Sequence, residues 1–329
     1  MKKYLLLVIG FCFLLIGCGG TNEKSVLRDL TKRIERLDSY HLVGELEIIN
    51  NEDSFIYDIE VSYIKGDNFR VSLRNKINNH EQIILRNQDG VYVLTPNLNK
   101  SFKFQSEWPY NNSQSYLLQT ILNDIIQDKE RNFIETEEGY MFITKVNYSN
   151  NENLIRQNIY LDKDLNITQV EVLGNNDIVQ IRMIFHSIDE NVSFDSEYFT
   201  LRGNMSDVNG ESSTVASLSN IAYPMFLPEN TYLANQEKIT TDHGERVILT
   251  FNGDNPFMVI QEVARRSEQL ITIPVHGEPY IITGTVGALS DSSVSWVSNG
   301  IEFFVISDIL STERLLRVAN SFGTMTVSK

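Results

Sequence analysis

The chain has 329 residues, of which 42% are hydrophobic and 22% are charged, and its formal net charge is −15. This length and apolar content are sufficient for two domains that each bury a core. An excess of acidic residues argues against the basic patches that bind nucleic acid or anionic lipid, so we predict no nucleic-acid partner.

The first residues have the pattern of a bacterial lipoprotein export signal. Lys2 and Lys3 precede an apolar run at 4–16, which is shorter than the roughly 20 residues of a membrane-spanning helix. The run ends in the lipobox Leu-Ile-Gly-Cys, with Cys18 last. We therefore predict a signal peptide at 1–17 and a tether at 18–23. The thiol of Cys18 would carry a diacylglycerol, with palmitate-type chains.

Lipidation of Cys18 would hold the protein permanently on the extracytoplasmic face of the cell membrane, because two or more acyl chains give stable anchoring. Loss of Lys2 and Lys3 leaves 26 basic and 43 acidic residues, a formal charge of −17. Cys12 leaves with the signal peptide, so disulfides and thiolate metal sites are not predicted. A plain secretory signal and an uncleaved anchor helix are the alternatives.

Residues 24–202 are predicted to form one α+β domain. Apolar residues at helical spacing predict helices at 22–40 and 113–128. Alternating apolar and polar residues predict strands with one buried face, separated by turns rich in Gly, Asp and Asn. These strands fall at 45–48, 57–63, 69–73, 102–104, 140–146, 154–161, 167–173 and 178–185. A strongly curved antiparallel sheet, or half-barrel, covered by the two helices buries both apolar surfaces.

Residues 203–221 are small and polar, and we predict an interdomain linker there. A second, small α+β domain is predicted at 222–329. Its strands fall at 245–251, 257–264, 269–274 and 279–286, followed by a hairpin at 296–306 and a helix at 312–321. Asn299 and Gly300 supply the positive φ angles of the hairpin turn, and Ser311 caps the helix.

Over residues 24–202 the order of elements resembles the LolA-type lipoprotein-localisation fold. Residues 65–71, KGDNFRV, are similar to that family's turn and "Arg-Val" strand, and residues 89–96, DGVYVLTP, to its "dG-x-x-v-w-x-Y-x-P" strand. Residues 160–165 resemble its "w-i-D-k-x-t" turn, and residues 188–199 its closing strand. The resemblance implies the half-barrel. It also implies a carrier function, although a tethered chain departs from a soluble shuttle.

Within that group, the lipobox, the segment WPYNN at 108–112 and the second domain resemble sporulation-associated lipoproteins of spore-forming Gram-positive bacteria. These are similar to the germination lipoprotein that pairs with a cortex-modifying amidase. Residues 227–230 and 315–321 resemble parts of a small C-terminal domain of unknown function that such lipoproteins carry. The resemblance implies an envelope protein partner, with a cortex amidase as one candidate.

No set of residues with catalytic spacing is evident, so we predict that the chain is not an enzyme and needs no metal or cofactor. The histidines are at positions 41, 80, 186, 243 and 276, without metal-ligand spacing. Gly284 and Gly287 are predicted to form a turn, Asp162 and Asp164 to be solvated turn acids, and His186 to lie at the surface. The carboxylates at 135, 137 and 138 have no predicted cleft.

Aromatic residues on the strands would line the inside of the half-barrel. They are Tyr57, Tyr63, Phe69, Tyr92, Phe102 and Phe104. Either they enclose a space for an acyl chain, or the apolar stripe of the 113–128 helix fills the interior. We favour the filled interior. Trp108 and Tyr110, in a turn with proline and asparagine, are predicted as exposed partner contacts, with packing at the edge of the core as the alternative.

Three hypotheses follow for function. The leading one is a membrane-anchored, non-enzymatic binding or accessory protein of the cell envelope, acting in sporulation or germination through a protein partner. The alternative is a lipid or lipoprotein carrier that uses an apolar half-barrel cavity. An enzyme acting on cell wall or envelope lipid is the third.

Replacing Cys18 tests the anchor. Cys18→Ala removes the only thiol of the predicted mature chain, so the protein should lose the mass of the added diacylglycerol, and any protein cleaved of residues 1–17 should move from the membrane fraction to the soluble extracytoplasmic fraction. The measurement is fractionation followed by immunoblotting and intact mass. Cys12→Ala, inside the signal peptide, is the control and should leave the protein on the membrane. A wild-type intact mass without an added diacylglycerol, or membrane retention of a Cys18 variant that has lost residues 1–17, would exclude the lipid anchor.

Overall fold

A computed structural model describes residues 22–50, 53–148, 150–205, 218, 221–241 and 244–322. The predicted signal peptide, Cys18 and most of the predicted linker lie outside the described residues. The chain divides into two compact units, one ending at Arg36 and one beginning at Leu37, and both sheets belong to the second unit. Among the described residues, no helix has both the length and the apolar character needed to span a membrane.

Helix α2 (Glu23–Glu35) belongs to the first unit and begins with a capping box. The Asn22 side chain accepts a hydrogen bond from the Ser25 amide, and the Ser25 hydroxyl accepts one from the Asn22 amide. Its buried residues are Val26, Leu30 and Ile34, at the predicted helical spacing. The helix ends earlier than predicted because the chain becomes extended at Ser39.

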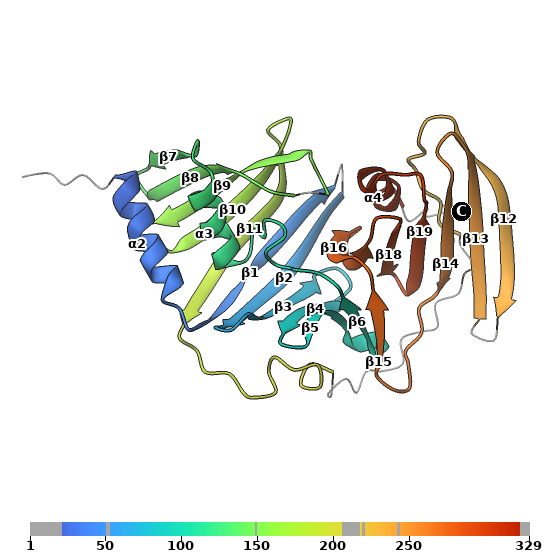
Figure 1. The fold of residues 1–329 in the computed structure, drawn as a ribbon, viewed down its shortest axis with the longest axis horizontal. Helices are drawn as coiled ribbons and strands as arrows, with labels where there is room; N and C mark the ends of the chain where they lie inside the picture. The colour runs from blue at the N-terminus through green and yellow to red at the C-terminus, as the bar shows by residue number, and fades with distance from the viewer. Residues whose placement is uncertain are drawn as a thin grey trace, which may run out of the picture. The chain divides into compact units, whose positions relative to one another are not determined.

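The larger sheet has twelve strands and is mostly an antiparallel meander (Figure 1). Its order is β15-β6-β5-β4-β3-β2-β1-β11-β10-β9-β8-β7. The bounds are β1 (Ser39–Asn50), β2 (Asp53–Ile64), β3 (Asn68–Asn75), β4 (Glu81–Asn87), β5 (Gly90–Thr95), β6 (Lys100–Phe104), β7 (Asn132–Glu135), β8 (Gly139–Lys145), β9 (Leu154–Asp162), β10 (Ile167–Gly174), β11 (Val179–Glu190) and β15 (Ile271–Val275). A short 3-10 turn, η2 (Pro96–Leu98), joins β5 to β6.

Helix α3 (Leu118–Gln127) lies against this sheet at β8 (Figure 1). The Tyr40 hydroxyl of β1 donates a 2.9 Å hydrogen bond to Gln119 of the helix. The apolar stripe of α3 is buried, as the filled-interior hypothesis predicts: Leu118, Ile121, Leu122 and Ile125 are at most 5% exposed. The sheet face that carries Tyr40 is called the inner face below.

Strand register places five of the six predicted lining aromatics on the inner face and one on the other. Tyr63 is opposite both Tyr40 and Phe69, and the pairing continues across β4 and β5 to Phe104. Tyr92 lies one residue out of phase with that row. It packs on the outer face in a cluster with Phe199. The prediction for Tyr92 is therefore wrong, because neighbouring strand residues point to opposite faces.

The smaller sheet has seven strands in the order β12-β13-β14-β19-β18-β17-β16. The bounds are β12 (Thr231–Thr241), β13 (Gly244–Gly253), β14 (Phe257–Val263), β16 (Glu278–Ile282), β17 (Thr285–Leu289), β18 (Ser293–Ser298) and β19 (Ile301–Ile306). Asn299 and Gly300 have φ values of 49° and 75°, which confirms the predicted hairpin turn. The strand predicted at 279–286 is instead the β16–β17 hairpin, because the chain turns at Thr283-Gly284 with positive φ at both residues.

Helix α4 (Thr312–Asn320) completes the core of the smaller sheet. The Ser311 side chain accepts a hydrogen bond from the Arg314 amide, as the cap prediction requires. Leu315 and Val318 are fully buried among apolar residues that include Trp296 and Phe303. Two strand-rich sheets with few helices confirm the predicted α+β class.

The two sheets are joined by a strand and by buried polar contacts. β15 comes from the second half of the chain but pairs in parallel with β6 of the larger sheet. On the inner face, buried Gln82 donates from Nε2 to the Val286 carbonyl (2.8 Å) and accepts from the Val286 amide (2.5 Å). An ion pair between Lys100 and Glu302, at 3.0 Å and with both side chains largely buried, forms a further link.

One carboxylate is partly buried between α3 and the larger sheet. Asp124 of α3 accepts a 2.7 Å hydrogen bond from Gln157 Nε2 of β9. Burial raises the pKa of Asp124 to about 6, although hydrogen bonds from Ser113 and Gln157 oppose the shift. The folded protein therefore holds a proton on Asp124 over a range of pH in which the unfolded chain has released it.

Removing the Gln82 amide should destabilise the protein. Gln82→Leu keeps a side chain of similar size but leaves the amide and carbonyl of buried Val286 without partners, at a cost of about 2–4 kcal/mol. Urea unfolding would measure the free-energy change. Gln127→Leu, at an exposed glutamine of α3, is the control and should change stability by less than about 0.5 kcal/mol. Equal losses in both variants would refute a special role for Gln82.

Replacing Asp124 by Asn should change the pH dependence of stability. Because the folded-state pKa is raised, wild-type stability falls as the pH rises from about 4 to about 6. Asp124→Asn removes this loss, so the variant should be more stable at pH 7 by up to about 3 kcal/mol and nearly equal to wild type at pH 4. Unfolding by urea at both pH values is the measurement. Exposed Asp189→Asn is the control, and a gain that does not depend on pH would contradict the assignment.

Candidate functional site

Trp108 and Tyr110, the two predicted partner contacts, have different environments. Trp108 is only 2% exposed and packs edge-on against Phe69 of the inner face, with ring centres 6.1 Å apart. The Trp108 carbonyl also accepts a 2.5 Å hydrogen bond from Arg86. The expected exposure of Trp108 is therefore wrong. An aromatic sheet face offers the indole more apolar contact than a solvated turn does.

Tyr110 is 51% exposed, in agreement with the prediction. Its hydroxyl donates a 2.7 Å hydrogen bond to Asp67, and the Arg86 guanidinium lies 5.4 Å from the ring centre. Partial burial and the bond to Asp67 raise the pKa of Tyr110 above its ordinary value, so the hydroxyl remains a donor. Tyr110 is a fixed, accessible aromatic, and its role as a partner contact stays a prediction.

Strand β12 is an exposed edge that the sequence pattern did not reveal. It pairs with β13 on one side and ends the smaller sheet on the other, without a further neighbour among the described strands. Tyr232, Leu233 and Ile239 are 60%, 40% and 40% exposed. The strand TYLANQEKITT lacks sustained alternation, because neither of its faces is buried. It therefore presents apolar side chains beside backbone groups that have no strand partner among the described residues, although the Gln236 amide donates to Oδ1 of the neighbouring Asn235.

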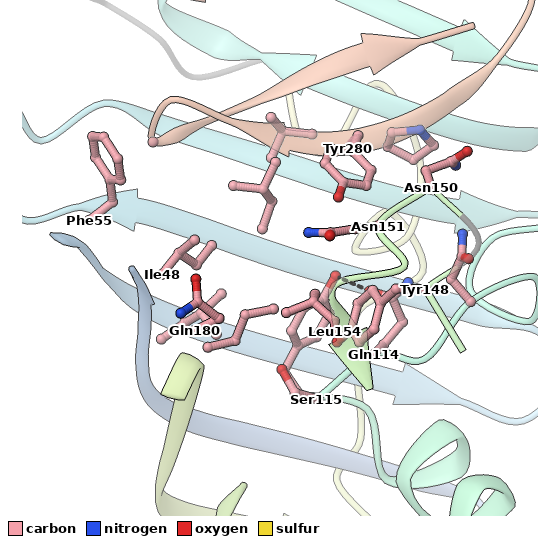
Figure 2. A pocket seen from close by; sticks show the side chains of 18 of the residues that line it. Ile48, Phe55, Gln114, Ser115, Tyr148, Asn150, Asn151, Leu154, Gln180 and Tyr280 are labelled. Atoms are coloured by element: carbon pink, nitrogen blue, oxygen red, sulfur yellow. Dashed lines mark hydrogen bonds between the residues drawn. The ribbon is translucent and has the colours of Figure 1, made fainter. Parts of the chain in front are cut away.

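A cavity of about 170 Å³ lies between the inner face of the larger sheet and the β16–β17 hairpin (Figure 2). Ile48 and Leu154 line it from the larger sheet, and Tyr280 from the hairpin. The wall also includes polar groups such as Ser115 and Asn151. This volume is below the roughly 300–1,000 Å³ of ordinary ligand pockets. The mixed lining does not favour an acyl chain in particular, so the carrier hypothesis stays a prediction.

Glu278 lies beside the cavity, where the two sheets meet. Three asparagine amides donate to its carboxylate: Asn111, Asn112 at 3.2 Å, and Asn150. Burial raises the pKa of Glu278, and the amide donors oppose this shift by stabilising the charged form. The carboxylate is thus held by neutral donors from loops of the larger sheet and fixes those loops against β16.

The structure also places the remaining residues that the sequence pattern singled out. Asp162 accepts hydrogen bonds from the amides of Asp164 and Asn166, which confirms a turn at this position. His186 is exposed, as predicted, and so are the acids at 135, 137 and 138. Gly284 lies in the β16–β17 turn, although Gly287 lies within β17. Within the described ranges, no three His, Cys, Asp or Glu residues form a group that could hold a metal ion.

The solved structures that match this chain share little sequence with it. The crystal structure of MucB is 13% identical, with a TM-score of 0.34, over 92% of this chain and 98% of that one. The GerS lipoprotein in complex with the CwlD amidase from Clostridioides difficile is 16% identical (TM-score 0.31; 53% of this chain and 97% of that one). A putative outer membrane lipoprotein-sorting protein domain from Vibrio parahaemolyticus is 10% identical (TM-score 0.33; 53% and 94%).

Sequence comparison gives a closer relationship. No family model matches the chain. The sporulation protein YdcC of Bacillus subtilis (strain 168) is 34% identical over 326 residues, which cover 97% of this chain and 96% of YdcC. This similarity extends over both sheets and confirms the predicted resemblance to sporulation-associated proteins. The chain therefore belongs to the family of the sporulation protein YdcC.

Proposed function

We propose that the chain is a membrane-tethered, non-enzymatic accessory protein of sporulation that binds a protein partner along the free edge of β12. Membership of the YdcC family supports the sporulation role, and the lipobox ending at Cys18 supports the tether. The exposed edge of β12 carries the proposal for a partner.

An extended segment of a partner fits this edge by strand addition. Unpaired backbone N–H and C=O groups at a sheet edge give affinity, and side chains on alternate positions give specificity. Natural proteins usually shorten or cover such edges. β12 instead runs over eleven residues. Register places Tyr232 and Ile239 on one face of this strand and Leu233 on the other, so a paired segment would contact apolar groups on both faces.

Charge and family resemblance narrow the choice of partner. The predicted mature chain carries 43 acidic and 26 basic residues, so electrostatic attraction favours a basic partner. The sequence resemblance to germination lipoproteins makes the organism's own cortex amidase the first candidate. The engaged carboxylates support a non-enzymatic role, because Asp162 accepts hydrogen bonds within its own turn and Glu278 accepts them from loops of the larger sheet.

Disrupting the side chains of β12 should weaken partner binding. Tyr232→Lys with Ile239→Lys replaces exposed apolar groups by charges that also repel a basic partner, so the affinity of detergent-solubilised full-length protein for the amidase should fall at least about tenfold. Ile77→Lys, at a residue 79% exposed in the β3–β4 turn, is the matched control and should bind like wild type. Calorimetric titration provides the dissociation constants.

Hydrogen exchange separates strand pairing from side-chain contact. Backbone amides within 231–241 that face the free edge should gain protection when the amidase binds, whereas those of the exposed edge strand β7 should not. Binding that leaves the exchange of β12 unchanged, or that the β12 variant does not weaken, would refute the proposed surface. Failure of the amidase to bind at all would refute this partner.

A further inference from the structure

A second hollow, larger than the cavity, lies where α4 approaches the loops of the larger sheet. Its volume is about 570 Å³, within the range of small-ligand sites. It shares Asn151, Leu154 and Tyr280 with the inner cavity. Seven of its fifteen lining residues carry a side-chain amide. The hollow is called the amide groove below.

Hydrogen bonds within the loops orient several of these amides. Asn153 Oδ1 accepts a 3.2 Å bond from Asn175 Nδ2, and Asn176 Oδ1 accepts a 3.2 Å bond from the Ile178 amide. A primary amide has two N–H donors and two acceptor lone pairs, so one internal bond leaves most of its capacity for a ligand. The amide groove therefore presents donors and acceptors that are already held in place.

Gly174 allows these groups to come close together. A Cβ atom at this position would lie 3.2 Å from Asn176 Oδ1 and 3.4 Å from Gln180 Cγ, a tight fit on both. Glycine thus leaves room for two amide side chains at the end of β10. The groove is built from the β10–β11 turn, the loop before β9 and the end of α4.

The amide groove is nearly neutral in a protein of net charge −15. Its lining has one acid, Glu313, and one base, Arg317. The Arg317 guanidinium lies 4.2 Å from the centre of the Phe226 ring, which is the geometry of a cation–π contact. Phe226, Tyr280 and Leu154 add apolar surface. A ligand that matches this lining is uncharged, rich in donors and acceptors, and has apolar faces.

We propose that the amide groove binds a neutral N-acetylated glycan. Sugar hydroxyls both donate and accept hydrogen bonds, as side-chain amides do. The acetamido group adds an amide for the asparagines and a methyl group for Leu154 and Tyr280, and the C–H faces of a sugar ring match aromatic side chains. The inference concerns a different surface from β12 and does not depend on the proposed protein partner.

Other ligand classes fit less well. An acyl chain would displace water from the Nδ2 donors of Asn153 and Asn176 without offering them an acceptor, at a cost of about 1–3 kcal/mol for each group. An anionic ligand would meet a single base, Arg317, in a strongly acidic protein. An extended neutral peptide could use the amides, but would not need an acetamido group, and this difference separates the two classes in an experiment.

The test is titration of detergent-solubilised full-length protein with tri-N-acetylchitotriose, by calorimetry and by saturation-transfer NMR of the acetamido methyl protons. Binding with a Kd of about 1 mM or tighter is expected. Cellotriose, which has hydroxyls but no acetamido groups, should bind at least fivefold more weakly. A parallel pull-down with purified peptidoglycan distinguishes a cell-wall polymer from a free oligosaccharide as the source of this chemistry.

Asn153→Asp is the main variant, because it keeps the acceptor for Asn175 but replaces the donors by a negative charge. It should weaken chitotriose binding at least tenfold without changing the unfolding temperature. Asn176→Ala should have a similar effect. Asn78→Ala is the matched control, since Asn78 makes the same kind of turn bond, to the His80 amide, outside the groove.

Two results would overturn the proposal. One is the absence of chitotriose binding at millimolar concentration, or binding that the Asn153 and Asn176 variants do not weaken more than Asn78→Ala does. The other is tighter binding of a capped tetra-alanine peptide than of chitotriose, with the same sensitivity to Asn153→Asp. That outcome would assign the groove to a protein segment instead.

Discussion

The side-chain amide of Gln82 connects the two sheets in a place that excludes water. It projects from the inner face of β4 and satisfies both the amide and the carbonyl of Val286 on β17. A buried peptide group without partners costs more than most apolar contacts contribute, so this pair of bonds also fixes the register of the contact. The same two-way bond recurs within the smaller sheet, where Gln261 pairs with the backbone of Ala222.

The contact between Gln82 and Val286 also explains where the inner cavity and the amide groove lie. With β17 fixed over the inner face, the neighbouring hairpin strand β16 brings Tyr280 and Glu278 against the loops of the larger sheet. The space that remains between them is the mixed cavity, and its outer continuation is the amide groove. At the opposite edge of the smaller sheet from β16, β12 has no further neighbour among the described strands. The contact between Gln82 and Val286 thus positions the hairpin that borders both hollows.

Local patterns in the sequence predicted much of the fold because their causes are local. Alternation of apolar and polar residues predicted β2, β3, β9 and β10, Asn299-Gly300 predicted a hairpin turn, and Ser311 predicted the start of a helix.

Features that depend on long-range contacts left no such pattern in the sequence. Both faces of β12 are exposed, so its sequence has no alternation of apolar and polar residues. The parallel pairing of β15 with β6 joins segments 171 positions apart, which no local pattern can indicate. Trp108 was predicted to be exposed because it lies in a loop, and its burial depends on contact with Phe69 of β3, which is distant in the sequence. The groove was missed for the same reason, since its amides come from three separate segments.

The pairing of β6 with β15 also affects the order in which the protein can fold. The paired residues Ser101 and Thr272 are 171 positions apart, and ribosomes add roughly 5–20 residues per second. During synthesis, roughly ten to thirty seconds therefore pass between the completion of β6 and the appearance of its partner strand β15. Contacts of such long sequence separation form late. Until then, the unpaired edge of β6 can pair with strands of other chains, which leads to aggregation. Folding of the larger sheet is complete only after β12, β13 and β14 of the smaller sheet have been made, so a chain that stops before β15 would leave the edge of β6 unpaired.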